Sequence, residues 1–306
     1  RRQRQMCIRD RMVEIGCGGY PGRQHCDPEV LLNDKAALSA FEKTIQDSGL
    51  EISALSCHGN PVHPNKEIAA RFDRHMRNAV LMAEALGIHQ INGFSGCPGD
   101  CPNSLYPNWV VCAWPEDNAK ILEYQWNEVL IPYWREFVAF AKTHGVDKIG
   151  LEMHQAFCVY NTETLLRLRE AVGPEIGANL DPSHLIWQGM DPIAVIRKLG
   201  SEAIFHVHAK DTKIDAANTA VNGVLDAKSY ADEIHRSWIF RSIGYGHDEL
   251  FWKDFVSNLR LVGYDYVLSI EHEDSLLSKN EGLVKAVDVL KRAIPFEDKM
   301  TSMRWI

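Results

Sequence analysis

The sequence predicts an α/β fold: a (β/α)8 TIM barrel that lacks its first βα unit. Short β-branched runs alternate with amphipathic stretches of helical length, a pattern typical of βα units around a parallel sheet. Polar residues able to bind a cation lie at the ends of the last four runs. The carboxyl ends of barrel strands hold the active site in this architecture, so these residues indicate a functional face.

Seven strands are expected, at residues 12–15, 52–57, 90–94, 148–153, 177–181, 204–209 and 267–271. Seven helices are expected, at residues 34–47, 66–86, 119–144, 162–171, 192–199, 249–262 and 281–293. A closed barrel of this type needs eight strands, because tilt, shear and strand number are linked. We therefore expect one βα unit to be absent.

Residues 1–11, RRQRQMCIRDR, show neither a helical nor a strand period. We interpret them as a foreign or artefactual segment and residues 12–306 as one barrel domain. The segment occupies the place where a first strand and helix should precede residue 12, so we attribute the missing unit to N-terminal truncation. A natural basic arm is the alternative interpretation.

Charge and hydropathy exclude several classes of protein. The formal net charge is −8, and no block of basic residues follows the first eleven, so nucleic acid is a poor candidate partner. No apolar run is long enough to cross a membrane, and no secretory signal is evident. We expect a cytoplasmic protein. The sequence leaves self-association into a homo-oligomer open.

The cysteines are irregularly spaced in a chain too large to need disulfides, which favours reduced thiols. Cys97, Cys101 and Cys112 could bind zinc, but a single C-x3-C without a second pair is a weak motif.

The last four strands end on Glu152, Asp181, His208 and Glu271. Three carboxylates and an imidazole that converge on one point would repel one another unless a cation lay between them. Oxygen-rich ligation favours Mn2+ or Mg2+, with Co2+ or Zn2+ as substitutes. Each residue alone could instead form a salt bridge or cap a loop. His206 lies on the same strand face as His208 and is an alternative ligand.

Other polar residues follow the strand ends. His58 and His154 are expected to contact substrate from this position, although His58 could simply cap a turn. Lys210 and Asp211 are expected to form a salt bridge at the rim.

Two connections, residues 95–118 and 211–248, are longer than a compact barrel needs, and long loops are usually functional. Trp109, Trp114 and Trp187 could form an apolar wall for a sugar ring, or could simply pack. Trp126 and Trp134 lie in a predicted helix and are expected to pack.

The segments LEMH, NLDPSHL, FHVHAKD, RSIGYGH and LSIEHED resemble the sugar phosphate isomerase/epimerase family with a xylose isomerase-like barrel. The resemblance extends from residue 12 nearly to the C-terminus. It implies that Glu152, Asp181, His208 and Glu271 are the metal ligands, with His208 preferred over His206. It also implies that His184 and Arg241 bind substrate.

The predicted function is a metal-dependent sugar or polyol isomerase or epimerase that works by proton transfer through an enediolate. The resemblance implies that Glu152 and Glu271 act as catalytic base and acid on a small carbohydrate. A keto-sugar or inosose dehydratase, or a keto-glycoside lyase, could use the same metal site. An apurinic endonuclease and a non-catalytic sugar-binding barrel are weaker alternatives.

Overall fold

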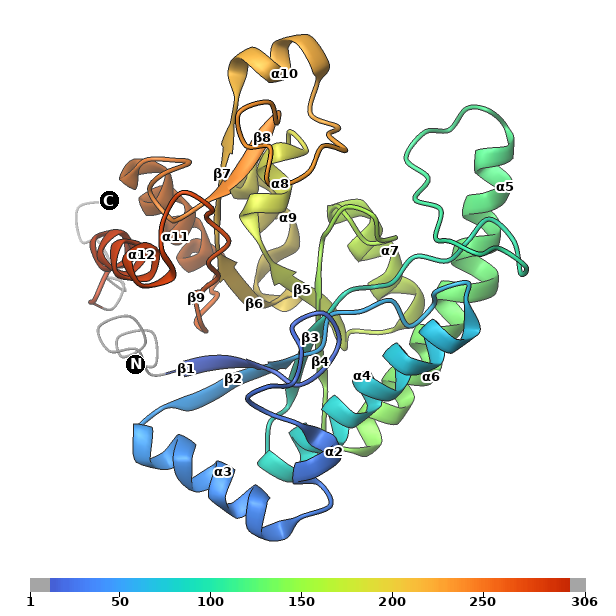
Figure 1. Ribbon diagram of the computed structural model, residues 1–306, viewed down its shortest axis with the longest axis vertical. Helices are drawn as coiled ribbons and strands as arrows, with labels where there is room; N and C mark the ends of the chain where they lie inside the picture. The colour runs from blue at the N-terminus through green and yellow to red at the C-terminus, as the bar shows by residue number, and fades with distance from the viewer. Residues whose placement is uncertain (1–11, 298–306) are drawn as a thin grey trace, which may run out of the picture. The chain divides into compact units, whose positions relative to one another are not determined.

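The computed structural model describes residues 12–297, which fold into two compact units (Figure 1). The N-terminal unit comprises residues 12–180 and 202–207, and the C-terminal unit comprises residues 181–201 and 208–297. The expectations for residues 1–11 lie outside the described residues. Within 12–297, no helix combines the length and the apolar character needed to cross a bilayer.

The N-terminal unit is built on six parallel strands, hydrogen-bonded in chain order. They are β1 (Met12–Gly16), β2 (Glu51–Ser56), β3 (Gln90–Gly93), β4 (Lys148–Glu152), β5 (Ile176–Leu180) and the first part of β6 (Ile204–Ala209). The residues of β5 and β6 are buried throughout. Such runs, buried on both faces, are what a parallel sheet covered by helices requires.

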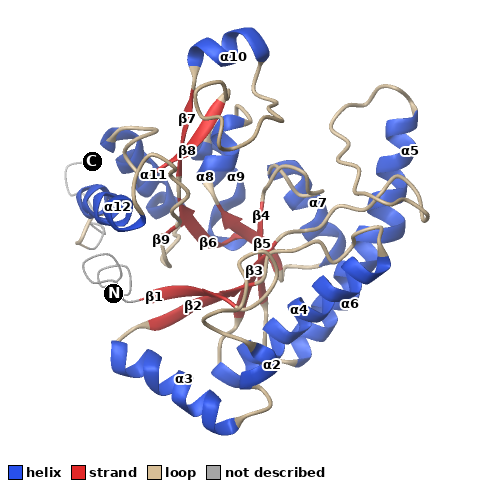
Figure 2. Cartoon of the chain, in the orientation of Figure 1, coloured by secondary structure: helices blue, strands red, loops and turns tan. Residues whose placement is uncertain are grey.

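The helices of this unit are α2 (Pro28–Leu31), α3 (Lys35–Ser48), α4 (Lys66–Leu86), α5 (Asp117–Glu123), α6 (Ile131–Thr143) and α7 (Thr162–Val172). Helices α3, α4, α6 and α7 lie outside the strands (Figure 2). Helices α4 and α6 run side by side, joined by Arg77, whose Nη2 lies 2.8 Å from Oε1 of Glu136. Asn65 caps the start of α4 and Gly87, at φ 66°, ends it, so sequence-encoded caps fix its limits.

A π-helix, η1 (Tyr124–Leu130), joins α5 to α6. Pro132 follows at the start of α6. Proline has no N–H and its ring collides with the carbonyl one turn earlier, which disfavours regular α-helical bonding at this point. The wider turn therefore interrupts what the sequence predicts as one helix over 119–144. It also sets the direction of Gln125 and Trp126, which are both buried.

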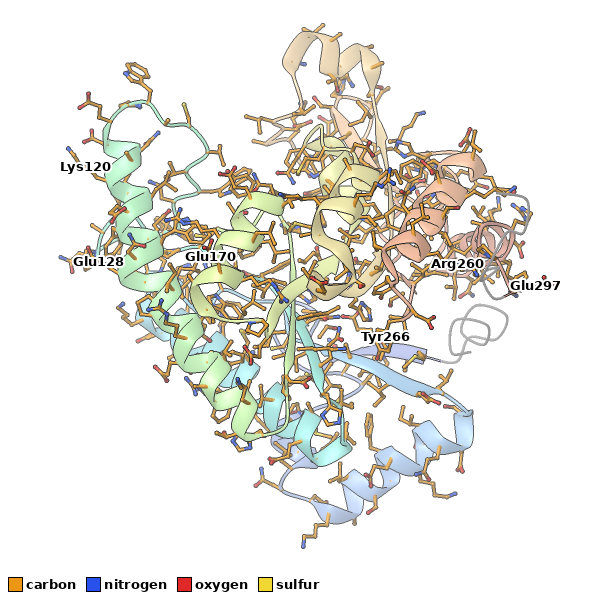
Figure 3. The ribbon with its side chains drawn as sticks, turned by 180° about the vertical axis from the view of Figure 1, so that it is seen from behind. Lys120, Glu128, Glu170, Arg260, Tyr266 and Glu297 are labelled. Carbon is orange, nitrogen blue, oxygen red and sulfur yellow. The ribbon has the colours of Figure 1, made fainter. Side chains whose placement is uncertain are left out.

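The C-terminal unit contains the end of β6, paired in parallel with β9 (Ser269–Ile270) through His208 opposite Ser269. It also contains a two-stranded antiparallel sheet of β7 (Asp211–Ile214) and β8 (Trp238–Arg241). Its helices are α8 (Pro182–Trp187), α9 (Pro192–Ala203, whose last two residues belong to the N-terminal unit), α10 (Ala216–Asn222), α11 (Glu249–Val262) and α12 (Lys279–Ala293). Helices α11 and α12 pack together. Arg260 at the end of α11 donates to the carbonyl of Glu297 at 2.6 Å, and both residues are labelled in Figure 3.

All seven predicted strands are present, within two residues at each end, and they are the seven parallel strands of the described chain. The predicted helices are present as well. The β7–β8 sheet was missed, because the sequence interpretation treats 211–248 as a loop. The fold is thus α/β and TIM-barrel-like. That the eighth βα unit is missing because of N-terminal truncation stays a prediction.

Candidate metal centre

Three of the four predicted ligands come together in the C-terminal unit. Asp181, His208 and Glu271 each offer one ligand atom, and these atoms lie within 4.8 Å of one another. Nδ1 of His208 lies 3.0 Å from Oε2 of Glu271. Asp181 and His208 are buried, whereas Glu271 is partly exposed. One cation could therefore contact all three side chains while one edge stays open to solvent.

The position of each ligand follows from the local fold. Asp181 directly follows β5 and caps helix α8, with Oδ1 accepting from the backbone N–H of Ser183 at 2.8 Å. That bond fixes the carboxylate. His208 lies on β6, and Glu271 follows β9, where its backbone N–H donates to the carbonyl of Ala209 at 3.3 Å. The pairing of β6 with β9 thus sets the two side chains next to each other.

The donor set fits a divalent cation. Two carboxylates and one imidazole are ligands that Mn2+, Mg2+, Co2+ and Zn2+ accept. Two carboxylates so close together favour a positive charge between them. The buried His/Asp/Glu cluster is therefore consistent with a divalent metal site.

Lys210 lies beside this cluster and supplies a positive charge of its own. It is 2% exposed, and its Nζ lies 3.5 Å from Oε2 of Glu271, 3.8 Å from Oδ2 of Asp181 and 2.5 Å from Oε2 of Glu273. The ammonium also lies 4.2 Å from the centre of the Phe240 ring. A buried lysine is stable only with such partners.

The predicted rim salt bridge between Lys210 and Asp211 is wrong. Asp211 is fully buried and its Oδ2 accepts from the backbone N–H groups of Gly244, Gly246 and His247, while Oδ1 meets Nδ1 of His247 at 2.8 Å. Lys210 lies between the end of β6 and the start of β7, and the Asp211 carboxylate is taken up by the backbone of residues 244–247, so the two side chains have different partners. Asp211 organises the turn before α11.

The two residues implied as substrate contacts lie in the same unit. Nε2 of His184, on α8, lies 3.5 Å from Oδ2 of Asp181. Arg241 ends β8, and its Nε lies 3.1 and 3.2 Å from the two oxygens of Asp274. Within the described chain, no hydrogen bond or ion pair is found for the two terminal nitrogens of Arg241. These two nitrogens are therefore available to donate hydrogen bonds to an oxygen of a ligand.

Asp274 is a positioning residue that the sequence interpretation missed. Its carboxylate is fully buried and also accepts from the N–H groups of Ser242 and Leu276, at 2.8 and 2.9 Å. Burial raises the pKa of Asp274, but these N–H groups and the Arg241 guanidinium together hold the pKa below its ordinary value. The sequence feature that could have indicated Asp274 is the polar run HED, residues 272–274, after the last strand.

The fourth predicted ligand, Glu152, lies in the N-terminal unit at the end of β4 and is 4% exposed. His58, which follows β2, places Nε2 3.4 Å from Oε2 of Glu152. His154 packs at 4.7 Å and His58 at 4.6 Å from the Phe94 ring. The structure thus brings together Glu152 and both histidines that were predicted from strand-end positions.

A glycine fixes the loop that packs on His58. Gly19 has φ 66°, and a Cβ there would lie 1.9 Å from the carbonyl oxygen of His58. The absent side chain lets the N–H of Tyr20 donate to that carbonyl at 2.7 Å. Only glycine fits this close approach.

A polar network fills the interior of the N-terminal unit. His206 is fully buried, with Nδ1 3.1 Å from Oδ1 of Asn179 and Nε2 3.2 Å from Oγ of Ser53. Asn92 donates to Glu14 at 2.9 Å. The residues of this network lie on five strands, β1, β2, β3, β5 and β6, so His206 serves here as an interior hydrogen-bonding residue. Glu14 was overlooked, although an acidic residue in a buried strand was a usable signal.

The aromatic and cysteine predictions have mixed outcomes. Trp187 stacks on Trp238 at 4.8 Å, Trp114 is 77% exposed, and Trp134 is fully buried. The seven cysteines of the described chain are free thiols, five of them buried. Cys97, Cys101 and Cys112 do not appear together in any cluster of metal-ligand spacing within residues 12–297.

Comparison with known proteins agrees with this fold. The family model described as "Xylose isomerase-like TIM barrel" matches residues 10–293. The chain belongs to this family. The uncharacterized protein YfiH of Bacillus subtilis (strain 168) is 39% identical over 285 residues, which cover 92% of this chain and 90% of YfiH.

Two solved structures of similar fold share little sequence with the chain. A D-tagatose 3-epimerase-like protein aligns with a TM-score of 0.59 and 19% identity, covering 92% of this chain and 97% of its own. The IOLI protein, solved with a zinc atom, aligns with a TM-score of 0.61 and 19% identity, covering 92% and 89%. At this identity the likeness shows the fold alone.

Proposed function

We propose that the protein is a divalent-metal-dependent isomerase or epimerase acting on a small sugar or sugar derivative. The proposal rests on one observation above all: Asp181, His208 and Glu271 gather their ligand atoms within 4.8 Å in a partly open site. The names of structurally similar proteins, including an epimerase-like protein, support the reaction class.

The proposed metal ligands are Glu152, Asp181, His208 and Glu271. A divalent ion held there would polarise a substrate carbonyl and make the neighbouring C–H more acidic. Mn2+ or Mg2+ is favoured by the oxygen-rich donor set, with Co2+ or Zn2+ as substitutes. Glu152 is included because it lies at the carboxyl end of β4, as Asp181 and Glu271 lie at the carboxyl ends of β5 and β9.

The chain's own residues then bind the substrate and move the proton. Glu271 takes up or returns the proton, and Glu152 is the proposed partner carboxylate for the reverse role. Arg241, held at Nε by Asp274, directs its two terminal nitrogens to substrate oxygens and stabilises the negative charge of an enediolate. His184, His58 and His154 are proposed to bind hydroxyl groups.

Proton transfer has a direct test. The metal-loaded protein is incubated with a panel of ketoses, including D-tagatose, and with inososes in deuterated water. NMR and mass spectrometry then follow the products. We expect a new stereoisomer or aldose with deuterium bound to carbon. A product lighter by one water, or by a sugar leaving group, would instead identify a dehydratase or lyase on the same site.

Two variants separate catalysis from folding. Glu271→Gln should lower turnover by about 100-fold or more, because a positioned proton-transfer group contributes about 10²–10⁴-fold. Glu170→Gln is the matched control, since Glu170 is an exposed carboxylate on α7, labelled in Figure 3. Full turnover in Glu271→Gln with metal still bound would refute the assignment, as would no exchange with any substrate.

A further inference from the structure

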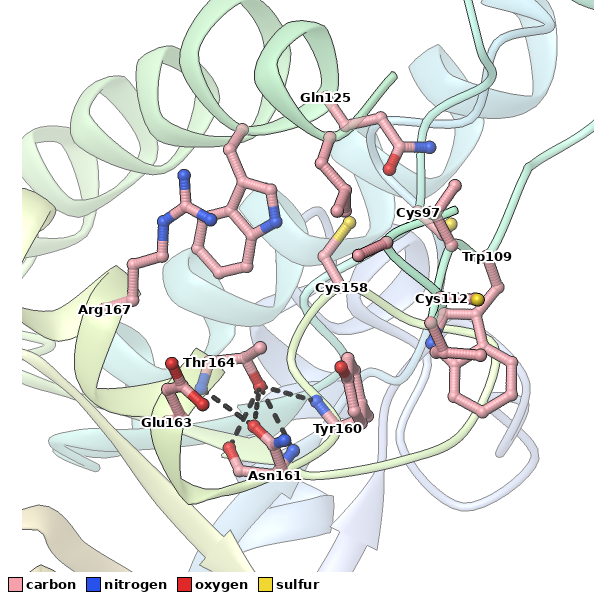
Figure 4. A pocket seen from close by; sticks show the side chains of 15 residues that line it. Cys97, Trp109, Cys112, Gln125, Cys158, Tyr160, Asn161, Glu163, Thr164 and Arg167 are labelled. Carbon is pink, nitrogen blue, oxygen red and sulfur yellow. Dashed lines mark hydrogen bonds between the residues drawn. The ribbon is translucent and has the colours of Figure 1, made fainter. Parts of the chain in front are cut away.

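A cavity lies in the N-terminal unit, between the long connection after β3, the helical turns of α5 and η1, and the start of α7 (Figure 4). Its volume is about 230 Å³. The side chains around it include Trp109, Gln125, Trp126, Glu163 and Arg167, and none of the residues proposed for the metal centre. The cavity is therefore a separate candidate site, and it gives a role to the long connection 95–118.

One end of the cavity carries a cation. The Arg167 guanidinium lies 4.1 Å from the centre of the Trp126 ring, which holds it flat. Within residues 12–297, no carboxylate forms an ion pair with Arg167. Figure 4 shows Arg167 on the side of the cavity away from Trp109. An anion bound at this end would complete a charge-assisted bidentate contact.

The other end offers one hydrogen-bond donor and one acceptor. Nε1 of Trp109 is buried and has no partner among the described residues. Gln125 is 1% exposed, and its Nε2 donates to the carbonyls of Pro98, Gly99 and Asn108 at 3.1, 3.2 and 2.7 Å. These bonds fix the amide orientation and leave Oε1 without a donor in the described chain. A hydroxyl group could satisfy both, accepting from Trp109 and donating to Gln125.

The walls between the two ends are aromatic and apolar. Trp109 meets Tyr160 edge-on, with ring centres 5.5 Å apart. Cys97, Val110 and Cys158 also line the cavity and are buried. The volume is below the range of about 300–1,000 Å³ that is typical of pockets for drug-sized ligands, so a single ring is the appropriate size. The unusual π-helical turn that presents Gln125 and Trp126 is a geometry often found at functional sites.

We propose that this cavity binds a monocyclic aromatic carboxylate bearing a hydroxyl group at the far end of the ring. The carboxylate pairs with Arg167, the ring lies against Trp109 and Tyr160, and the hydroxyl bonds to Trp109 and Gln125. Glu163, one turn before Arg167 on α7, also lines the cavity and repels the carboxylate. We therefore expect the cavity to bind the aromatic carboxylate with moderate affinity.

The probe is 4-hydroxybenzoate, titrated into the full-length protein at pH 7 in a calorimeter. We expect saturable 1:1 binding with a dissociation constant below about 1 mM. Benzoate, which lacks the hydroxyl, and 4-hydroxybenzyl alcohol, which lacks the charge, should each bind at least about fivefold more weakly. Absence of saturable binding up to about 10 mM would overturn the proposal and leave a cavity filled by water alone.

Three variants assign the binding to this cavity. Arg167→Gln should weaken binding about tenfold, Trp109→Phe about threefold, and Glu163→Gln should strengthen it about twofold to threefold. Arg197→Gln is the matched control, because Arg197 is an exposed arginine in the C-terminal unit. Equal weakening by Arg167→Gln and Arg197→Gln would overturn the proposal.

Chelation separates this site from the metal centre. Binding of 4-hydroxybenzoate should be unchanged after EDTA treatment and in Glu271→Gln. Loss of binding under either condition would place the ligand at the metal centre and refute a separate site. Failure of the proposed isomerase activity, in contrast, would leave this binding result unaffected.

Discussion

Replacing Asp274 by asparagine should remove the support of Arg241 and destabilise the fold. The carboxylate is fully buried, whereas the Arg241 side chain is 15% exposed. The asparagine keeps one acceptor oxygen, but its amide N–H groups face the donors of Arg241, Ser242 or Leu276. Hydrogen bonds to charged groups contribute about 1.5–3 kcal/mol, and unpairing a buried charge costs about 3–5 kcal/mol. We expect the free energy of unfolding to fall by about 3 kcal/mol.

Urea denaturation at pH 7 measures this loss, with Arg292→Gln as control. Arg292 pairs with Glu249 at 2.7 Å on the surface, at side-chain exposures of 55% and 34%. Loss of that exposed pair should cost less than about 1 kcal/mol. If Asp274→Asn cost no more than the control, the argument that Asp274 positions Arg241 would be refuted.

The same pair has a pH signature. The pKa of Asp274 is lowered in the folded protein, so its ionised form stabilises the fold at pH values above its unfolded pKa of about 3.9. That contribution is lost as the pH falls through the lower, folded pKa. The stability difference between the wild type and Asp274→Asn should therefore be constant from pH 5 to 7 and shrink below about pH 4.

Three further changes test other parts of the structure. Gly150→Ala should cost about 1–3 kcal/mol of unfolding free energy, because its Cβ would lie 2.4 Å from Oδ1 of Asn92 in the interior network; an unchanged urea midpoint would contradict this. Asp226, with a pKa of about 2, accepts from the N–H of Ser237 at 2.7 Å, so Asp226→Asn should lose about 2 kcal/mol at pH 7 and only a small part of that near pH 2, as followed by chemical denaturation across pH. Lys210→Met should lower the melting temperature of the metal-free protein more than that of the metal-loaded protein, since the ion replaces the missing charge; equal losses in a thermal scan would count against the site.

The strands could be predicted because their pattern is strong. The runs that form β5 and β6 are short and buried throughout, and they alternate with amphipathic helices. The β7–β8 pair could not be predicted, because each strand has only four residues and 23 residues separate Ile214 from Trp238. The π-helix was also invisible, since Pro132 signals a break without specifying how the chain continues.

The residues of the candidate site that lie at strand ends could be predicted from the sequence. Asp181, His208 and Glu271 were found because parallel strands end at one edge. Asp274 was missed, because its role depends on the approach of β8 to the chain after β9, which no local pattern encodes. The expected pairing of Lys210 with Asp211 failed for the same reason, because the partners of both side chains come from distant parts of the chain: Glu273 for Lys210 and residues 244–247 for Asp211.

The most direct test of the metal centre is the metal content of the purified protein. The wild type, His208→Ala and the control Glu170→Gln are each loaded in turn with Mn2+, Mg2+, Co2+ and Zn2+ and then dialysed. Inductively coupled plasma mass spectrometry measures the metal that each protein retains. We predict about one equivalent of divalent ion per chain in the wild type and the control, and a loss of affinity of about 10-fold or more in His208→Ala. A wild type that retains no ion, or a His208→Ala protein that binds it equally well, would contradict the account.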